Sequence, residues 1–78
     1  LNTLGYQLLQ SKRVKEAIEI FRLNAEMFPN SSNAYDSLGE AYIVNGDNGL
    51  AIESYKKSIE LNPNNATGKQ MLEKLKSK

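Results

Sequence analysis

The sequence predicts an all-α protein made of two antiparallel helical hairpins and one further helix. The main observation is a repeat, because shifting the chain by 34 residues places one copy of a pattern on a second. The other is that apolar residues recur at helical spacing in both copies. A fixed period of this length is typical of stacked helical hairpins, which usually hold partners rather than do chemistry. The superposed identical pairs include Leu4 with Leu38, Gly5 with Gly39, Ala17 with Ala51, Ile18 with Ile52, Glu19 with Glu53, Glu26 with Glu60, Pro29 with Pro63 and Asn30 with Asn64.

The first hairpin is predicted to contain helices at about 1–10 and from Val14 to just before Pro29. A short polar turn, 11–13, separates them, as antiparallel neighbours require. The residue before a proline is pushed out of the helical region, so the second helix ends there. The apolar residues of the first helix have helical spacing and are Leu1, Leu4, Leu8 and Leu9.

The second hairpin is predicted to begin near Asn33. Its turn contains Gly46, which can take the left-handed conformation that ends a helix, and Asp47, whose carboxylate can cap the next helix. We expect that next helix to bury Leu50 and to end at Asn62. A fifth helix follows from Ala66, and its apolar residues Met71, Leu72 and Leu75 fit one side only, which predicts a cap over the last hairpin.

Composition excludes several classes of function. The formal net charge is +1, with ten Lys and Arg against nine Asp and Glu, so no strong field favours nucleic acid or an anionic membrane as partner. Without Cys or His, disulfides, zinc fingers and the commonest general base are absent, and we expect no cofactor and no metal. No apolar run approaches the ~20 residues of a membrane span. The chain opens on Leu1 without Met or a signal peptide, which indicates a piece of a longer protein and leaves its compartment unknown.

The spacing of the second copy resembles the tetratricopeptide repeat at Tyr35, Leu38, Gly39, Tyr42, Ala51, Tyr55 and Pro63. The first copy matches the same pattern at Leu1, Leu4, Gly5, Leu8, Ala17, Phe21 and Pro29, although Leu1 and Leu8 replace large aromatic residues. The resemblance implies a single domain, 1–78, with repeats at 1–32 and 33–65 and a capping helix at 66–78, as the start of a right-handed superhelix. We expect Gly5 and Gly39 to face Ala17 and Ala51, with Phe21 and Tyr55 directed toward the neighbouring hairpin.

A second, less specific resemblance concerns the segments 4–9 and 33–42. The amino-acid sequence of these segments is similar to that of repeat tails at the C-terminus of bacterial secreted serine hydrolases. This resemblance implies only a bacterial parent protein in which the chain would be an accessory module.

Motifs for catalysis have simpler explanations here. The run 54–57 fits the Ser-x-x-Lys signature of penicillin-binding enzymes, but Ser54 is expected on the outer side of its helix and no other catalytic motif accompanies it. We therefore predict that the chain is not an enzyme. Two matches to the glycosylation pattern, at Asn30 and Asn65, are better explained by helix capping in loops rich in Asn and Ser.

In the resembled family, ligands lie in a concave groove formed by the first helix of each hairpin. The matching outward positions are Asn2, Tyr6, Leu9, Gln10, Asn33, Asp36, Glu40, Ile43 and Val44. Asp36 and Glu40 are four residues apart and could also form a carboxylate pair for acid-base work or a metal, or simply a solvated face. The family's carboxylate clamp is absent, because its places hold Asn2, Tyr6, Ser37, Thr67 and Met71. The groove's charge comes from Asp36 and Glu40, offset by Lys74.

Two hypotheses on function follow from these residues. The first is a protein-interaction module that binds a protein or peptide ligand of unknown identity in the groove. The alternative is a structural spacer or self-association element of a larger protein, since Leu1, Leu4 and Leu8 would be exposed at the open N-terminal end, where a second copy could form a homodimer.

Overall fold

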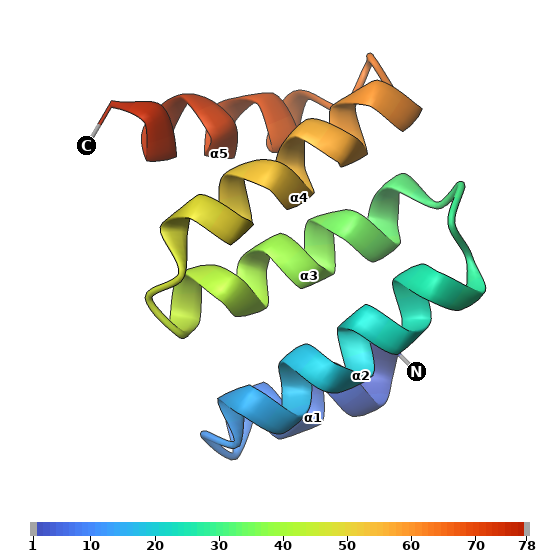
Figure 1. Ribbon diagram of the computed structural model, residues 1–78, viewed down its shortest axis with the longest axis vertical. Helices are drawn as coiled ribbons and strands as arrows, with labels where there is room; N and C mark the ends of the chain where they lie inside the picture. The colour runs from blue at the N-terminus through green and yellow to red at the C-terminus, as the bar shows by residue number, and fades with distance from the viewer. Residues whose placement is uncertain (1, 78) are drawn as a thin grey trace.

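The computed structural model describes residues 2–77, and this part of the chain folds into five α-helices and no strand (Figure 1). Leu1, predicted in the first helix, lies outside the described residues. The predicted all-α fold class is confirmed. Figure 1 shows α2, α3, α4 and α5 side by side in chain order, with α1 behind α2. The helices are α1 (Asn2–Gln10), α2 (Val14–Met27), α3 (Ser32–Val44), α4 (Asn48–Leu61) and α5 (Ala66–Lys76).

The turns inside the two hairpins have the same geometry. The backbone N–H of Lys12 donates to Leu9 at 3.0 Å, and that of Gly46 donates to Ile43 at 3.0 Å. Lys12 and Gly46 are 34 residues apart, and both have positive φ, 63° and 83°. Gly46 therefore takes the predicted left-handed conformation, whereas Lys12 adopts it despite its side chain, which carries a steric cost.

The start of α4 differs from the prediction. Asp47 is the residue before the helix, but its side chain makes no capping hydrogen bond. Its carboxylate instead accepts a hydrogen bond from Asn45 Nδ2 at 2.7 Å. The predicted cap is wrong because a neighbouring amide competes for the same oxygen atoms.

The starts of α3 and α5 carry side-chain caps from the loops rich in Asn and Ser. Ser31 Oγ accepts a hydrogen bond from the N–H of Ala34 at 3.2 Å. Asn65 Oδ1 accepts one from the N–H of Gly68 at 3.0 Å. Each bond satisfies a backbone donor that the first turn of a helix leaves free.

The core has two connected parts. The first lies mainly between α2 and α3, and its buried residues are Ala17, Ile18, Phe21, Ala25, Ala34, Leu38 and Ala41. The second joins α4 to α5 through Ala51, Tyr55 and Leu75. Tyr42 packs against both parts, so the hairpins and α5 share one continuous interior. Leu50 was predicted to be buried but is 49% exposed, because it lines an open surface hollow that α4 shares with α2.

The glycines of the two hairpins make room for aromatic rings of the same hairpin. A Cβ atom on Gly5 would lie 2.4 Å from Phe21 Cε1, and one on Gly39 would lie 2.8 Å from Tyr55 Cε2. The nearest side chain to each glycine is thus an aromatic ring of its own hairpin, and the two rings also join buried clusters that reach the next helix, α3 for Phe21 and α5 for Tyr55. Each ring rests on the first helix of its own hairpin, where only glycine leaves enough space.

The other residues of the repeat pattern divide by how much of each side chain is covered. Ala17, Phe21, Leu38, Ala51 and Tyr55 are buried, as are Gly5 and Gly39. Leu8, Tyr35 and Tyr42 are half-buried, and Leu4, Pro29 and Pro63 are exposed.

Candidate functional site

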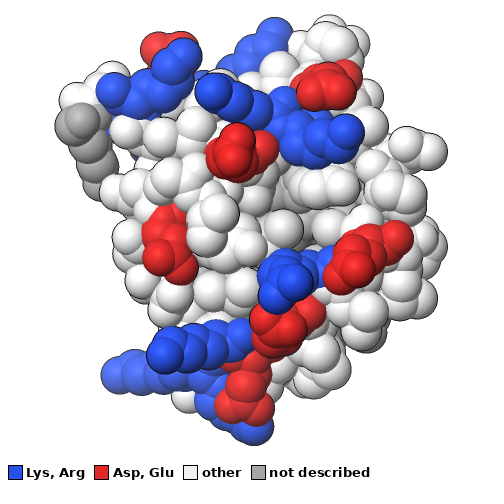
Figure 2. Space-filling model, viewed as in Figure 1, with Lys and Arg blue, Asp and Glu red and all other residues white. Residues whose placement is uncertain are grey.

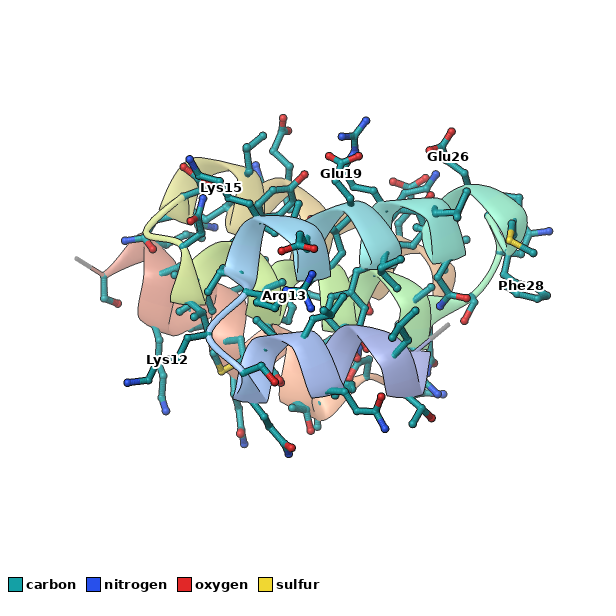
Figure 3. The ribbon with its side chains drawn as sticks, turned by 90° about the horizontal axis from the view of Figure 1, so that it is seen from below. Lys12, Arg13, Lys15, Glu19, Glu26 and Phe28 are labelled. Atoms are coloured by element: carbon teal, nitrogen blue, oxygen red, sulfur yellow. The ribbon has the colours of Figure 1, made fainter. Side chains whose placement is uncertain are left out.

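The first helices of the hairpins and α5 form one side of the molecule. Figure 3 shows α1 and α5 on the side opposite to α2 and α4, with α3 between them. On α2, Lys15, Glu19 and Glu26 point away from α1 (Figure 3). We call the side formed by α1, α3 and α5 the groove face, because most of the residues predicted to line a groove stand on these helices.

Tyr6 connects three helices on the groove face. Its hydroxyl group lies 3.1 Å from Ser37 Oγ on α3, within hydrogen-bond distance. Its ring meets that of Phe21 on α2 edge to face, with centroids 5.0 Å apart and an interplanar angle of 69°. This geometry is favourable for aromatic pairs, so the half-buried Tyr6 is held firmly in place.

Asp36 is engaged inside the protein. Its Oδ1 atom accepts hydrogen bonds from Ser58 Oγ at 2.6 Å and from Asn65 Nδ2 at 3.0 Å. Ser58 is fully buried and lies 2.7 Å, Oγ to Oγ, from Ser32. These four residues form an internal polar network that ties the start of α3 to the end of α4 and to the cap of α5. The network was not predicted, because hydrogen-bond partners more than 20 positions apart leave no local signal in the sequence.

Glu40 is an exposed carboxylate of α3 on the groove face. Within residues 2–77 it takes part in no ion pair. Its charge nevertheless acts on two tyrosines. Burial, followed by the charges of Glu40 and Asp36, raises the pKa of the Tyr55 hydroxyl to about 12. Burial also raises the pKa of the Tyr6 hydroxyl, opposed by the hydrogen bond with Ser37 and aided by the charges of Glu40 and Asp36 and by hydrogen bonding to Glu40.

Ion pairs concentrate on α2 and α4. Among the described residues they join Arg13 to Glu16, Arg22 to Glu19 and Lys57 to Glu60. Figure 2, which views the side of α2 and α4, shows acidic and basic side chains next to one another over much of the surface. In contrast, α1 has no charged residue, and Asp36 and Glu40 are the two charged residues of α3. The α1 and α3 part of the groove face is therefore electronegative.

A hollow of about 430 Å³ opens between α3 and α5. It is lined by Ile43 from α3, by Met71, Glu73, Lys74 and Leu75 from α5, and by Ser77, which follows α5. Ile43 was predicted as a groove residue, and Lys74 was expected to offset the groove's acidic charge. The hollow itself was not predicted, since it depends on how α5 packs against α4.

The remaining predicted groove residues are placed less centrally. Leu9 is half-buried and packs against the core between α2 and α3. Gln10, Asn33 and Val44 are exposed. The side chain of Asn2 lies outside the described part of the chain.

Tyr55 gives the protein a predicted alkaline transition. Its pKa rises from an ordinary value of 10.0 to about 12 in the folded state, and its side chain is only 3% exposed. The neutral hydroxyl is thus favoured by folding, so its contribution is fully present below about pH 10 and is lost as the pH rises toward 12. We expect wild type to lose about 2 kcal/mol more free energy of unfolding than Tyr55→Phe between these limits. Urea denaturation followed by circular dichroism measures this difference, and parallel pH profiles for the two proteins would contradict it.

Other sites have no support among residues 2–77. Ser54 was expected on the outer side of α4, but it is only 6% exposed, and its hydroxyl donates to the carbonyl oxygen of Leu50 at 3.1 Å. That expectation is wrong because α4 turns this side chain toward the interior. Within the same range, no group of three His, Cys, Asp or Glu side chains could hold a metal ion. None of the helices described there combines the length and apolar character needed to cross a bilayer.

Comparison with known proteins places the second hairpin in a family. The family model described as "Tetratricopeptide repeat" matches residues 32–65, which comprise α3, α4 and the loop that follows them. No curated protein matches the chain. Repeats of this family generally mediate protein–protein interaction and are typically scaffolds without catalytic activity. Residues 32–65 therefore match a tetratricopeptide repeat, and the described part of the chain around them, residues 2–77, is all-α.

Proposed function

We propose that the chain is a protein-interaction module that binds a segment of a partner protein on the groove face. The observation that carries this proposal is the hollow between α3 and α5, whose apolar residues Ile43, Met71 and Leu75 lie beside exposed charged groups. Concave sites with apolar walls and a few polar groups are where ligands usually bind. The internal polar network and the packing of Tyr6 keep this face rigid, so that little conformational entropy is lost on binding.

We also propose that residues 1–78 act as a single domain, with a first repeat at 1–32, a second at 33–65 and a capping helix at 66–78. The matching turns at Lys12 and Gly46 support the first repeat, because two hairpins with the same period also share their turn geometry. The packing of Leu75 against Ala51 and Tyr55 supports the role of α5 as a cap.

The function is tested by comparing partners captured from cell extract by three forms of the chain. The groove variant combines Glu40→Ala with Ile43→Ser, and the control combines Glu19→Ala with Leu23→Ser on α2, where Leu23 is 47% exposed. We expect wild type and control to capture the same partners in similar amounts. The groove variant should capture at least tenfold less of them, since removal of each central contact of an interface typically costs more than 1 kcal/mol of binding free energy. Mass spectrometry measures the captured proteins, and circular dichroism checks that all three forms stay helical.

Equal capture by the groove variant and wild type would refute binding on the groove face. Equal losses by the groove variant and the control would show that the effect is not specific to this side. Tyr6 is left unchanged, because its ring packs on Phe21 and its removal would also disturb the core.

Self-association is a second candidate, favoured by the apolar N-terminal end. Leu4 is 44% exposed, whereas Leu38, at the equivalent place of the second hairpin, is 7% exposed because α2 covers it. On α2, Leu23 and Met27 are also exposed, at 47% and 57%. A second copy that covers this end would bury such residues in a homodimer. Light scattering over a concentration series tests this candidate, and a strict monomer at high micromolar concentration would remove it.

A further inference from the structure

Among the described residues Glu40 takes part in no ion pair, which is also true of Glu26, Glu53 and Glu73, whereas three other acidic residues are paired. Glu16, Glu19 and Glu60 each pair with a basic residue three positions away on their own hairpin. Around Glu40, the helical neighbours three and four positions away are Asp36, Ser37, Ile43 and Val44, and none of them is basic. The sequence of α3 therefore provides no internal cation for this group.

Neighbouring helices do not neutralise Glu40 either. Helix α1 carries no charge, and Asp36, the other acid of α3, directs its carboxylate to Ser58 and Asn65. Lys74 on α5 lines the hollow, yet it forms no ion pair within residues 2–77.

A cationic side chain fits this place. An exposed carboxylate can accept two hydrogen bonds from an arginine, whose planar guanidinium group matches it and keeps its charge at any physiological pH. The adjacent tyrosine and serine hydroxyls offer further oxygen atoms to the same donor. A cation bound at Glu40 would lie beside the low-dielectric protein surface. The attraction between the cation and the carboxylate is therefore stronger there than in bulk water.

The hollow lies next to this place. Ile43, which forms its α3 wall, is three positions after Glu40, so that the two side chains are neighbours on one helix face about 5 to 6 Å apart. In an extended segment, side chains two residues apart point to the same side and are separated by about 6 to 7 Å. The spacing of Glu40 and Ile43 on α3 is close to that of alternate side chains in an extended segment. One segment could therefore contact Glu40 and the hollow at the same time.

We propose that the groove face recognises an extended partner segment that places an arginine or lysine on Glu40 and, two residues away, an aliphatic side chain in the hollow between α3 and α5. This inference rests on the proposed function and specifies the chemistry of the partner. Charge complementarity favours this occupant over an acidic segment, because Glu40, three residues before Ile43, and Glu73 on the wall of the hollow would both repel the latter.

The test is a titration of ¹⁵N-labelled full chain with three short peptides, followed by amide chemical shifts. The first peptide has the core Leu-Ser-Arg-Ser-Leu. It carries a leucine two residues before the arginine and another two residues after it, so that either chain direction can place a leucine in the hollow. The second has glutamate in place of arginine, and the third has serine in place of both leucines. We expect the first to shift the amide signals of Glu40, Ile43 and Lys74 with a Kd about fivefold lower than that of either other peptide, as one exposed ion pair of ~1 kcal/mol allows.

Two matched variants test the role of the carboxylate. Glu40→Gln should raise the Kd of the arginine peptide about two- to fivefold and leave the glutamate peptide no weaker. Glu26→Gln is the control, because Figure 3 shows Glu26 on the outer side of α2 and its removal changes the net charge equally. Higher salt should reduce the preference for arginine in wild type and control, since it screens exposed charges.

The outcomes separate this inference from the proposed function. If the glutamate peptide shifts the same amide signals with an equal Kd, the preference for a cation is refuted, while binding on the groove face stands. Unchanged binding of the arginine peptide to Glu40→Gln would refute the inference in the same way. If all peptides leave these signals unmoved up to about 5 mM, where even a Kd of ~1 mM would be visible, both proposals fall.

Discussion

The variant Phe21→Ala is expected to lose about 3 to 5 kcal/mol of free energy of unfolding, comparable to the whole stability of a small domain. Phe21 is fully buried, rests on Gly5 and meets the ring of Tyr6 edge to face. Truncation to alanine removes these contacts and leaves a cavity that the helices can close only partly. Urea denaturation followed by circular dichroism should show a largely unfolded chain at room temperature.

The matched control for this prediction is Phe28→Ala. Phe28 follows α2 directly, is 54% exposed, and points away from the helices in Figure 3. The same chemical change there should alter the free energy of unfolding by less than about 0.5 kcal/mol. Similar losses for both variants would mean that the space around Phe21 is not a packed core.

A chain that ends after Asn65 is expected to be partly unfolded or to aggregate. The deletion removes α5, whose Leu75 is 7% exposed and whose Met71 and Leu72 pack beside Ala51 and Tyr55. Burial of three such side chains contributes roughly 1.5 to 3 kcal/mol each before entropy is subtracted. Loss of the hydrogen bond from the Gly68 N–H also frees Asn65, which helps to satisfy Asp36 and Ser58 in the internal polar network.

Thermal melting followed by circular dichroism measures the effect of this deletion. A control chain that ends after Lys76 keeps all of α5 and should melt like the full chain. If the chain ending after Asn65 instead melts cooperatively within a few degrees of the full one, α5 is not a cap and its apolar residues contribute little to stability.

The helices themselves could be predicted because their signals are local. The observed α2 begins at Val14 and α5 at Ala66, as predicted, and α3 begins one residue before Asn33. Proline and glycine restrict the backbone wherever they stand, and apolar spacing reveals which side of a helix turns inward. The 34-residue period also predicted that the helices pair into hairpins, since repeated segments that bury the same face stack on one another.

The candidate site was predictable only in part. Whether a side chain is buried, and whether a polar group finds a hydrogen-bond partner, depends on residues that are distant in the chain. Ile43 and Glu40 were placed on one face by their spacing, but the hollow beside them exists only because α5, packed on α4, brings Met71 and Leu75 near Ile43. Asp36 has the same spacing and yet is engaged by Ser58 and Asn65. Leu50 is apolar at a helical position and nevertheless exposed, since it lines an open hollow beside α2 instead of the core. Local sequence thus specifies the helices and their apolar faces, whereas the contacts between helices determine which polar groups remain free to meet a partner.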